Sequence, residues 1–128
     1  EKHQMILVKD YTYIIKQGWF MLHDLSTISL PIGGKVYKLY VADSDEEKQQ
    51  GLSGLKSLEG AEGMIFPYDT DKPRTFQFKD TCLPLVVYFI GSNGKVLQKS
   101  TSSPYQQENI TCSKPCRWVI EIINSEAF

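Results

Sequence analysis

The sequence predicts an α+β domain that is mostly β: a compact antiparallel sheet or barrel-like domain with one or two short helices. Three observations predict this class. Short segments rich in β-branched and aromatic residues recur along the 128 residues. The pairs Gly33-Gly34 and Asn93-Gly94 separate such segments, as the turns of β-hairpins do. The clearest helix signal is brief and begins at Ser44.

Composition excludes several classes of protein. The hydrophobic fraction of 41% and the aromatic fraction of 12% argue against intrinsic disorder. Fourteen Lys and Arg against fifteen Asp and Glu give a formal net charge of -1, and the basic residues are scattered along the chain. We therefore expect no nucleic-acid partner. Every charge-free run is short and polar, so we also expect no membrane span, while the compartment stays open.

The first part of the chain differs from the rest. Residues 1–27 are expected to form an N-terminal extension, a strand or an arm, ahead of a single β-rich domain at 28–128. This extension is rich in aromatic side chains, among them Tyr11, Trp19 and Phe20. A large exposed aromatic patch is typical of an interaction surface. Residues 5–25 are therefore a candidate for docking on a protein partner or for self-association.

The elements that follow are predicted in chain order. Residues 26–32 and 35–42 form a hairpin around Gly33-Gly34. Ser44 and Glu47 have the spacing of a capping box, which predicts a helix from Asp45 to Gln50 or Leu52. Later strands are expected at 63–66 (closed by Pro67), 74–79, 85–90, 95–99 and 117–123, with loops at 69–73 and 100–104.

A polar cluster around the strand at 74–79 is the candidate ligand site. Its residues are Arg74, Gln77, Lys79, Asp80 and Thr81. Arg offers a planar fork and Lys a point charge, so a pocket here would suit a small anionic or polyhydroxylated ligand. Alternatively, Arg74 pairs with Asp69 or Asp71, and Asp80-Thr81 only caps a turn.

The cysteines and histidines predict no metal site and no cofactor. His3 and His23 lie far from Cys82, Cys112 and Cys116, and a zinc site needs about four ligands. The odd number of cysteines leaves at least one thiol free within a chain. Cys112 and Cys116 could form a local disulfide in an oxidising compartment or remain two thiols in a reducing one.

A string of spaced residues resembles the family catalogued as domain of unknown function 192, over about residues 28–124. It includes Gly51-Leu52, Gly63-Met64-Ile65-Phe66, Arg74-x-Phe76-x-x-Lys79-x-Thr81, Pro84-Leu85 and Gly94-Lys95-Val96. The resemblance implies a compact, mostly β domain from bacteria, archaea or viruses, often exported, with no established reaction. It also implies frequent cysteines near Cys112 and Cys116, which favours the disulfide slightly.

This chain departs from the typical pattern of that family within the candidate site. The family's Trp, Met and Asn are replaced by Gln77, Phe78 and Asp80, and its Asp after Pro-Leu is Val86. If those family residues form a polar pocket, it is altered here.

Three functions remain open. The first is a non-enzymatic small-ligand-binding or accessory module, because no nucleophile–base pair or phosphate-binding glycine loop is evident. The second is a structural or interaction protein that docks through the aromatic arm. The third is a hydrolase or transferase with Asp80 or Asp71 as base and Lys79 or Arg74 as anion stabiliser.

Overall fold

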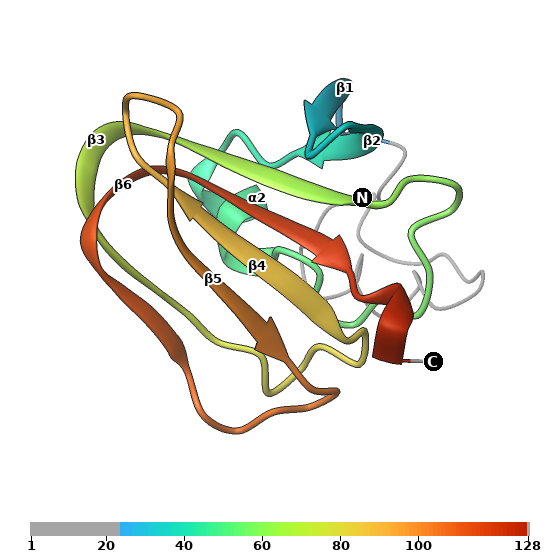
Figure 1. Cartoon of the computed structure of the whole chain (residues 1–128). Coiled ribbons are helices and arrows are strands. Elements are labelled where there is room, and N and C mark those ends of the chain that lie inside the picture. Colours follow the sequence, from blue (N-terminus) through green and yellow to red (C-terminus); the bar gives the residue numbers. More distant parts are fainter. Residues whose placement is uncertain (1–23, 128) are drawn as a thin grey trace.

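The structure is a computed structural model that describes residues 24–127. Six strands in this part of the chain form one open sheet that carries a single short α-helix, so the predicted mostly β, α+β class is confirmed (Figure 1). In chain order, the elements are β1 (Thr27–Ile32), β2 (Lys35–Val41), α2 (Asp45–Gln50), β3 (Gly63–Phe76), β4 (Leu85–Ile90), β5 (Val96–Ser102), β6 (Ile110–Ile123) and η2 (Ser125–Ala127).

The sheet is mixed, which corrects the expectation of an antiparallel or barrel-like sheet. Its strand order is β1-β2-β3-β6-β4-β5. All neighbouring pairs are antiparallel except β2 and β3, which run parallel with Tyr40 opposite Met64. Parallel neighbours need a crossover connection rather than a tight turn. The chain between β2 and β3 supplies this crossover and contains α2.

Both predicted hairpins are confirmed. β1 pairs with β2 from Thr27 opposite Tyr40 to Ile32 opposite Lys35, around two glycines with φ of 60° and 86°. β4 pairs with β5 around Asn93-Gly94, where Gly94 has a φ of 83°. Glycine adopts such positive φ angles without the steric cost that a Cβ atom brings.

Several predicted element boundaries are wrong, at the long central strands β3 and β6 and at the edge strand β5. β3 runs for 14 residues through Pro67 and the expected loop at 69–73, and it ends at Phe76 instead of residue 79. β6 begins at Ile110, seven positions before residue 117, and β5 continues through Ser102 into the expected loop at 100–104. The pairing of β3 with β6 shifts in register between Pro67 and Lys72, and again before Arg74. Such irregularities let a strand accommodate a proline and polar residues without ending.

The sheet has an apolar core on each face. One core contains the side chains of Leu39, Ile65, Ile120 and Ile122. The other is larger, takes in Leu52 and Leu55 from the segment after α2, and includes the large buried aromatic residues Phe66, Phe78 and Phe89. In Figure 1, α2 lies behind the long ribbons of β3 and β6. We call the face of this larger core the helix-side face.

The helix is short because strong signals bound it at both ends. Ser44 accepts a hydrogen bond from the Glu47 amide at 3.0 Å, and the Glu47 carboxylate accepts one from the Ser44 amide at 3.1 Å, so the predicted capping box is confirmed. Gly51 follows the last helical residue with a φ of 53°. These caps fix where α2 lies along the sheet, and therefore where its last residue, Gln50, is presented.

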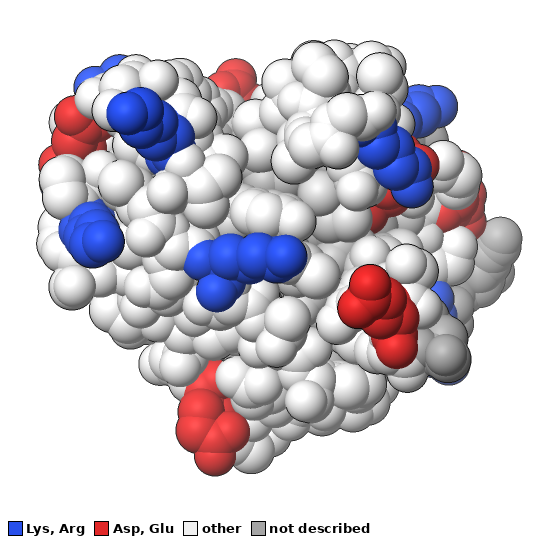
Figure 2. All heavy atoms as spheres, in the orientation of Figure 1, with Lys and Arg blue, Asp and Glu red and all other residues white. Residues whose placement is uncertain are grey.

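Two surface features bear on function. On the face shown in Figure 2, basic and acidic side chains are scattered among uncharged residues and form no single charged patch. Across residues 24–127, the structure contains no helix long and apolar enough to cross a bilayer. The predicted docking segment at 5–25 lies outside the described residues except for Asp24 and Leu25, so it stays a prediction, as does the boundary at residue 27.

Candidate functional site

A cleft of about 650 Å³ lies between α2 and the helix-side face of the sheet. Its walls come from α2 and the residues that follow it, from β3, and from the turn after β3, while β6 contributes one residue. The described lining residues are Glu46, Lys48, Gln49, Gln50, Gly51, Leu52, Ser53, Phe66, Tyr68, Thr75, Phe76, Gln77, Phe78, Lys79, Asp80, Thr81 and Glu121.

Four of the five predicted ligand residues line this cleft: Gln77, Lys79, Asp80 and Thr81. All four belong to the turn after β3, whereas the sequence had placed Gln77 and Lys79 in a strand. The Thr81 amide donates to the Phe78 carbonyl at 3.0 Å, and the Gly54 amide donates to the Asp80 carbonyl at 2.9 Å. The second bond ties the turn to the segment after α2, so the two walls of the cleft are held together by backbone hydrogen bonds.

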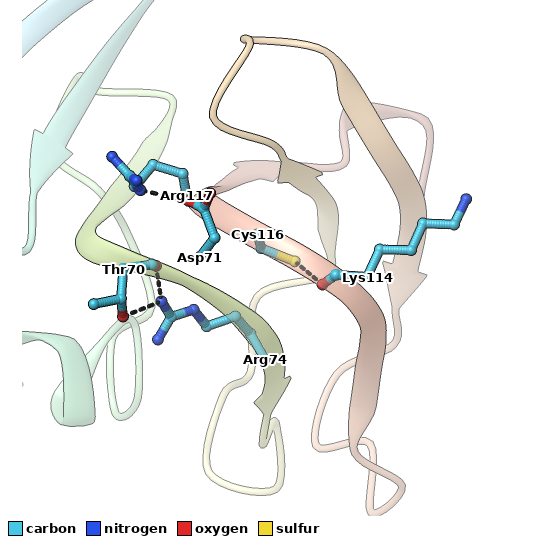
Figure 3. Close-up of polar contacts among 6 residues, drawn as sticks. All are labelled: Thr70, Asp71, Arg74, Lys114, Cys116 and Arg117. Atoms are coloured by element: carbon cyan, nitrogen blue, oxygen red, sulfur yellow. Dashed lines mark hydrogen bonds and ion pairs between the residues drawn. The ribbon is translucent and has the colours of Figure 1, made fainter.

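Arg74, the fifth predicted residue, is not part of the cleft lining. Its guanidinium carbon lies 3.7 Å from the centroid of the Tyr68 ring, and its side chain donates to the Thr70 carbonyl (Figure 3). The alternative that Arg74 pairs with Asp71 is wrong, because the Asp71 carboxylate accepts from Arg117 Nε at 2.7 Å. Arg74 therefore supports the ring of Tyr68, which itself lines the cleft.

Glu121 is the least expected residue of the cleft. It lies on β6 with an exposed fraction of 3%, opposite Met64 of β3 and Val87 of β4. Burial raises the pKa of this carboxyl group to about 8. Near neutral pH the carboxyl group is therefore mainly protonated, and in this form it can both donate and accept hydrogen bonds.

Tyr68 connects this acid to the charged groups nearby. Burial is the main cause that raises the pKa of Tyr68 to about 12. The positive charge of Arg74 lowers this pKa, whereas negative charge on Glu121 or Cys116 raises it further. Lys48 Nζ lies 5.2 Å from the centroid of the Tyr68 ring. The phenol thus remains neutral, with two cations against its ring.

The apolar part of the cleft is aromatic. Phe66 and Phe76 pack edge to face with ring centroids 5.1 Å apart, and Phe76 packs in the same way on Phe89 at 6.1 Å. A site with apolar walls and a few convergent polar groups is the usual form of a small-molecule site.

Glu121, Tyr68 and Gln50 were not predicted from the sequence as residues of the site. For Glu121 a signal was present, since it is the only charged residue in the otherwise apolar run from 118 to 123. An acid in a strand that is buried on both faces is unusual and points to a special role. Tyr68 lies between the strand predicted at 63–66 and the loop predicted at 69–73, and nothing local marks it. Gln50 belongs to a short polar helix, which hides the fact that its side chain is buried.

Two cysteines lie on β6, and one of them, Cys116, interacts electrostatically with Tyr68 of β3. Cys112 and Cys116 are both fully buried, and both Sγ atoms face the Lys114 carbonyl, at 4.0 and 3.2 Å (Figure 3 shows Cys116). Burial, together with a hydrogen bond to the Cys112 thiol, raises the pKa of Cys116 to about 12. All three cysteines of the chain are free thiols here, and the disulfide stays a prediction. Residues 24–127 hold no group of three or more metal-ligating side chains.

Fold and site together define a small, mostly β domain. Its cleft is lined by polar and aromatic residues and lies beside α2, the one α-helix of residues 24–127. The chain belongs to the DUF192 family, described as "Uncharacterized ACR", whose model matches residues 28–127. This membership confirms the resemblance seen in the sequence.

Two solved structures share the fold. One is a protein of unknown function from Novosphingobium aromaticivorans DSM 12444, with a TM-score of 0.67 and 24% identity, covering 80% of this chain and 76% of that one. The other, from Sinorhizobium meliloti 1021, is described as a "putative transcription regulator", with a TM-score of 0.63 and 25% identity, covering 76% and 78%. No curated protein matches the sequence.

Proposed function

We propose that this protein is a non-enzymatic small-ligand-binding module and that the cleft beneath α2 is its binding site. The observation that carries the proposal is Glu121, an acid that is only 3% exposed, lies among apolar residues of the sheet and lines the cleft. The predicted residues Gln77, Lys79, Asp80 and Thr81 line the same cleft and supply further polar groups.

Glu121 has an energetic cost in the folded protein. Burial in an apolar environment disfavours the charged form of a carboxyl group, and this cost appears as its raised pKa. An aliphatic residue at position 121, between Met64 and Val87, would avoid this cost. A ligand that enters the cleft and bonds to the carboxyl group would recover it, so the penalty in the free protein favours binding.

We prefer binding without a reaction because the cleft gathers only part of the groups expected for catalysis, namely Asp80 and Lys79. Its described lining contains no histidine or cysteine. Asp71, one of the two candidate bases, pairs with Arg117 and is not part of the lining. Arg74, a candidate anion stabiliser, is engaged with Tyr68 and Thr70.

The test is a thermal-shift screen of the full chain with small amines, carboxylates, phosphates and sugars, run on the wild type, Glu121→Leu and Glu108→Leu. Glu108 is an exposed acid that does not line the cleft and serves as the control. We expect at least one compound to raise the Tm of the wild type and of Glu108→Leu but not of Glu121→Leu. No shift with any class, or equal shifts in all three proteins, would contradict the proposal.

A further inference from the structure

Resting on this proposed function, the geometry points to a neutral, hydroxyl-rich ligand, a sugar or other polyol, that places one hydroxyl group on the carboxyl group of Glu121. The inference follows from three features of the cleft: what surrounds its deepest polar group, which charges are already engaged, and what its walls offer.

The first feature favours a neutral partner for Glu121. Its neighbours across the sheet are Met64 and Val87, which provide no charge and no strong hydrogen bond. A hydroxyl group both donates and accepts, so it can bond to the carboxyl group in either protonation state. It also brings no net charge into a largely buried position, where an unpaired charge is costly.

The second feature disfavours a charged ligand of either sign. A cationic ligand beside Tyr68 would meet Arg74 and Lys48, whose charges already lie 3.7 and 5.2 Å from the ring centroid. An anionic ligand would need a cation that is free to receive it, and the ammonium group of Lys48 already donates to the Asp43 carbonyl at 2.5 Å. Lys79, the other lysine of the lining, is followed in the chain by the acid Asp80, which also lines the cleft.

The third feature matches the alternating surface of a sugar. The rings of Phe66, Phe76 and Tyr68 provide apolar walls against which the C–H faces of a pyranose can pack. Near them, Gln77 and Asp80 present amide and carboxylate groups that bond to hydroxyl groups. The volume of about 650 Å³ lies within the usual range for small-molecule sites and accommodates a mono- or disaccharide.

Titration calorimetry on the full chain tests the ligand class with glucose, N-acetylglucosamine and maltose, with spermidine as the cation and citrate as the anion. Each probe is titrated into the wild type, Glu121→Gln, Glu121→Leu and the control Glu108→Gln. We expect a sugar to bind the wild type and the control equally. Glu121→Gln should keep its affinity within about threefold, because the amide still donates and accepts, whereas Glu121→Leu should lose about tenfold or more.

The other outcomes separate the two proposals. Two outcomes would show that the sugar inference is wrong while the binding function stands. In the first, spermidine binds the wild type and Glu121→Gln abolishes this binding. In the second, citrate binds and the sugars do not. A sugar that binds Glu121→Leu as tightly as the wild type overturns the role of Glu121. Silence of all five probes overturns the sugar inference, and the wider thermal-shift screen then decides the binding function. Circular dichroism of each variant confirms that it is folded, and the isosteric Gln variant preserves the shape of the site.

Discussion

Glu121 of β6 lies opposite Met64 of β3, so an acid and a thioether side chain occupy neighbouring positions on one apolar sheet face. This arrangement explains why burial alone raises the pKa of the carboxyl group to about 8. It also places the acid at the cleft, since Phe66, two residues after Met64, lines the same space. The first prediction concerns how stability responds when this carboxyl group ionises.

We expect the folded protein to lose stability relative to Glu121→Gln as the pH rises from about 5 to 8. The pKa of Glu121 in the folded state is about 8, above its ordinary value of 4.5, so the folded state holds the proton more tightly. Its stabilising contribution is complete below about pH 4.5 and is lost as the pH rises towards 8. The slope is at most about 1.4 kcal/mol per pH unit.

Urea unfolding of the wild type and Glu121→Gln at pH 5, 6.5, 8 and 9 measures this effect. The difference in free energy of unfolding between the two proteins removes the contribution of all other titrating groups. It should change between pH 5 and 8 and level off above that range. Glu108→Gln, which alters an exposed acid, should show no such change. A constant difference for Glu121→Gln would show that the carboxyl group is not buried in the way described.

The second prediction concerns the contact of Arg74 with Tyr68. We expect Arg74→Ala to destabilise the protein by about 1–2 kcal/mol, because it removes a cation–π contact and packing against a half-buried ring. Arg74→Lys should recover only part of this loss, since a lysine cannot stack a planar group. Lys72→Ala, at an exposed position on the same strand, should change stability by less than about 0.5 kcal/mol. Equal effects at positions 72 and 74 would argue against the contact.

The predictability of the fold can be judged on particular elements. Gly33-Gly34, Asn93-Gly94 and the Ser44–Glu47 box act locally, so turn and cap chemistry located them correctly. Pro67 was misread because its effect on a strand depends on the partner strand. The paired β6 and the register shifts near Lys72 let β3 continue, and neither feature is visible in the local sequence.

The site was only partly predictable for a related reason. Gln77, Lys79, Asp80 and Thr81 lie within five positions of one another, so their clustering was visible in the sequence. Glu121 joins them only through the pairing of β6 with β3, which brings together residues more than forty positions apart. Long-range pairing of this kind follows from the whole sheet and not from any local pattern.

The third prediction concerns Gly63, which begins β3. A Cβ atom at this position would lie 2.0 Å from the backbone carbonyl oxygen of Glu121. Because backbone atoms cannot move aside cheaply, we expect Gly63→Ala to cost about 3 kcal/mol or more. Gly94→Ala is the matched control: it meets nothing within 4 Å and suffers only from its positive φ, at a cost of about 1–2 kcal/mol. If the two variants are equally stable by urea unfolding, the close approach of β3 to β6 is wrong.

The fourth prediction concerns thiol reactivity. Cys116 and Cys112 are fully buried, and the raised pKa of Cys116 keeps it a thiol rather than the reactive thiolate. Under reducing conditions, iodoacetamide should therefore label the half-buried Cys82 at least about tenfold faster than either, as peptide mass spectrometry can measure. In protein prepared without reductant, resistance of both residues to labelling even after unfolding would support the predicted disulfide. Rapid labelling of Cys116 in the folded protein would contradict its burial.

The fifth prediction links the helix caps to the cleft. Ser44 and Glu47 hold the start of α2 through reciprocal hydrogen bonds, and α2 contributes Lys48 and Gln50 to the cleft. Ser44→Ala should lower the free energy of unfolding by about 1 kcal/mol, whereas Ser44→Asp keeps an acceptor for the Glu47 amide and should stay within about 0.5 kcal/mol of the wild type. If the cleft binds its ligand through the wall formed by α2, the Ala variant should also bind more weakly, and the Asp variant should not. Affinity that is equal in both variants, despite the expected difference in stability, would indicate that the ligand contacts only the sheet and the turn after β3.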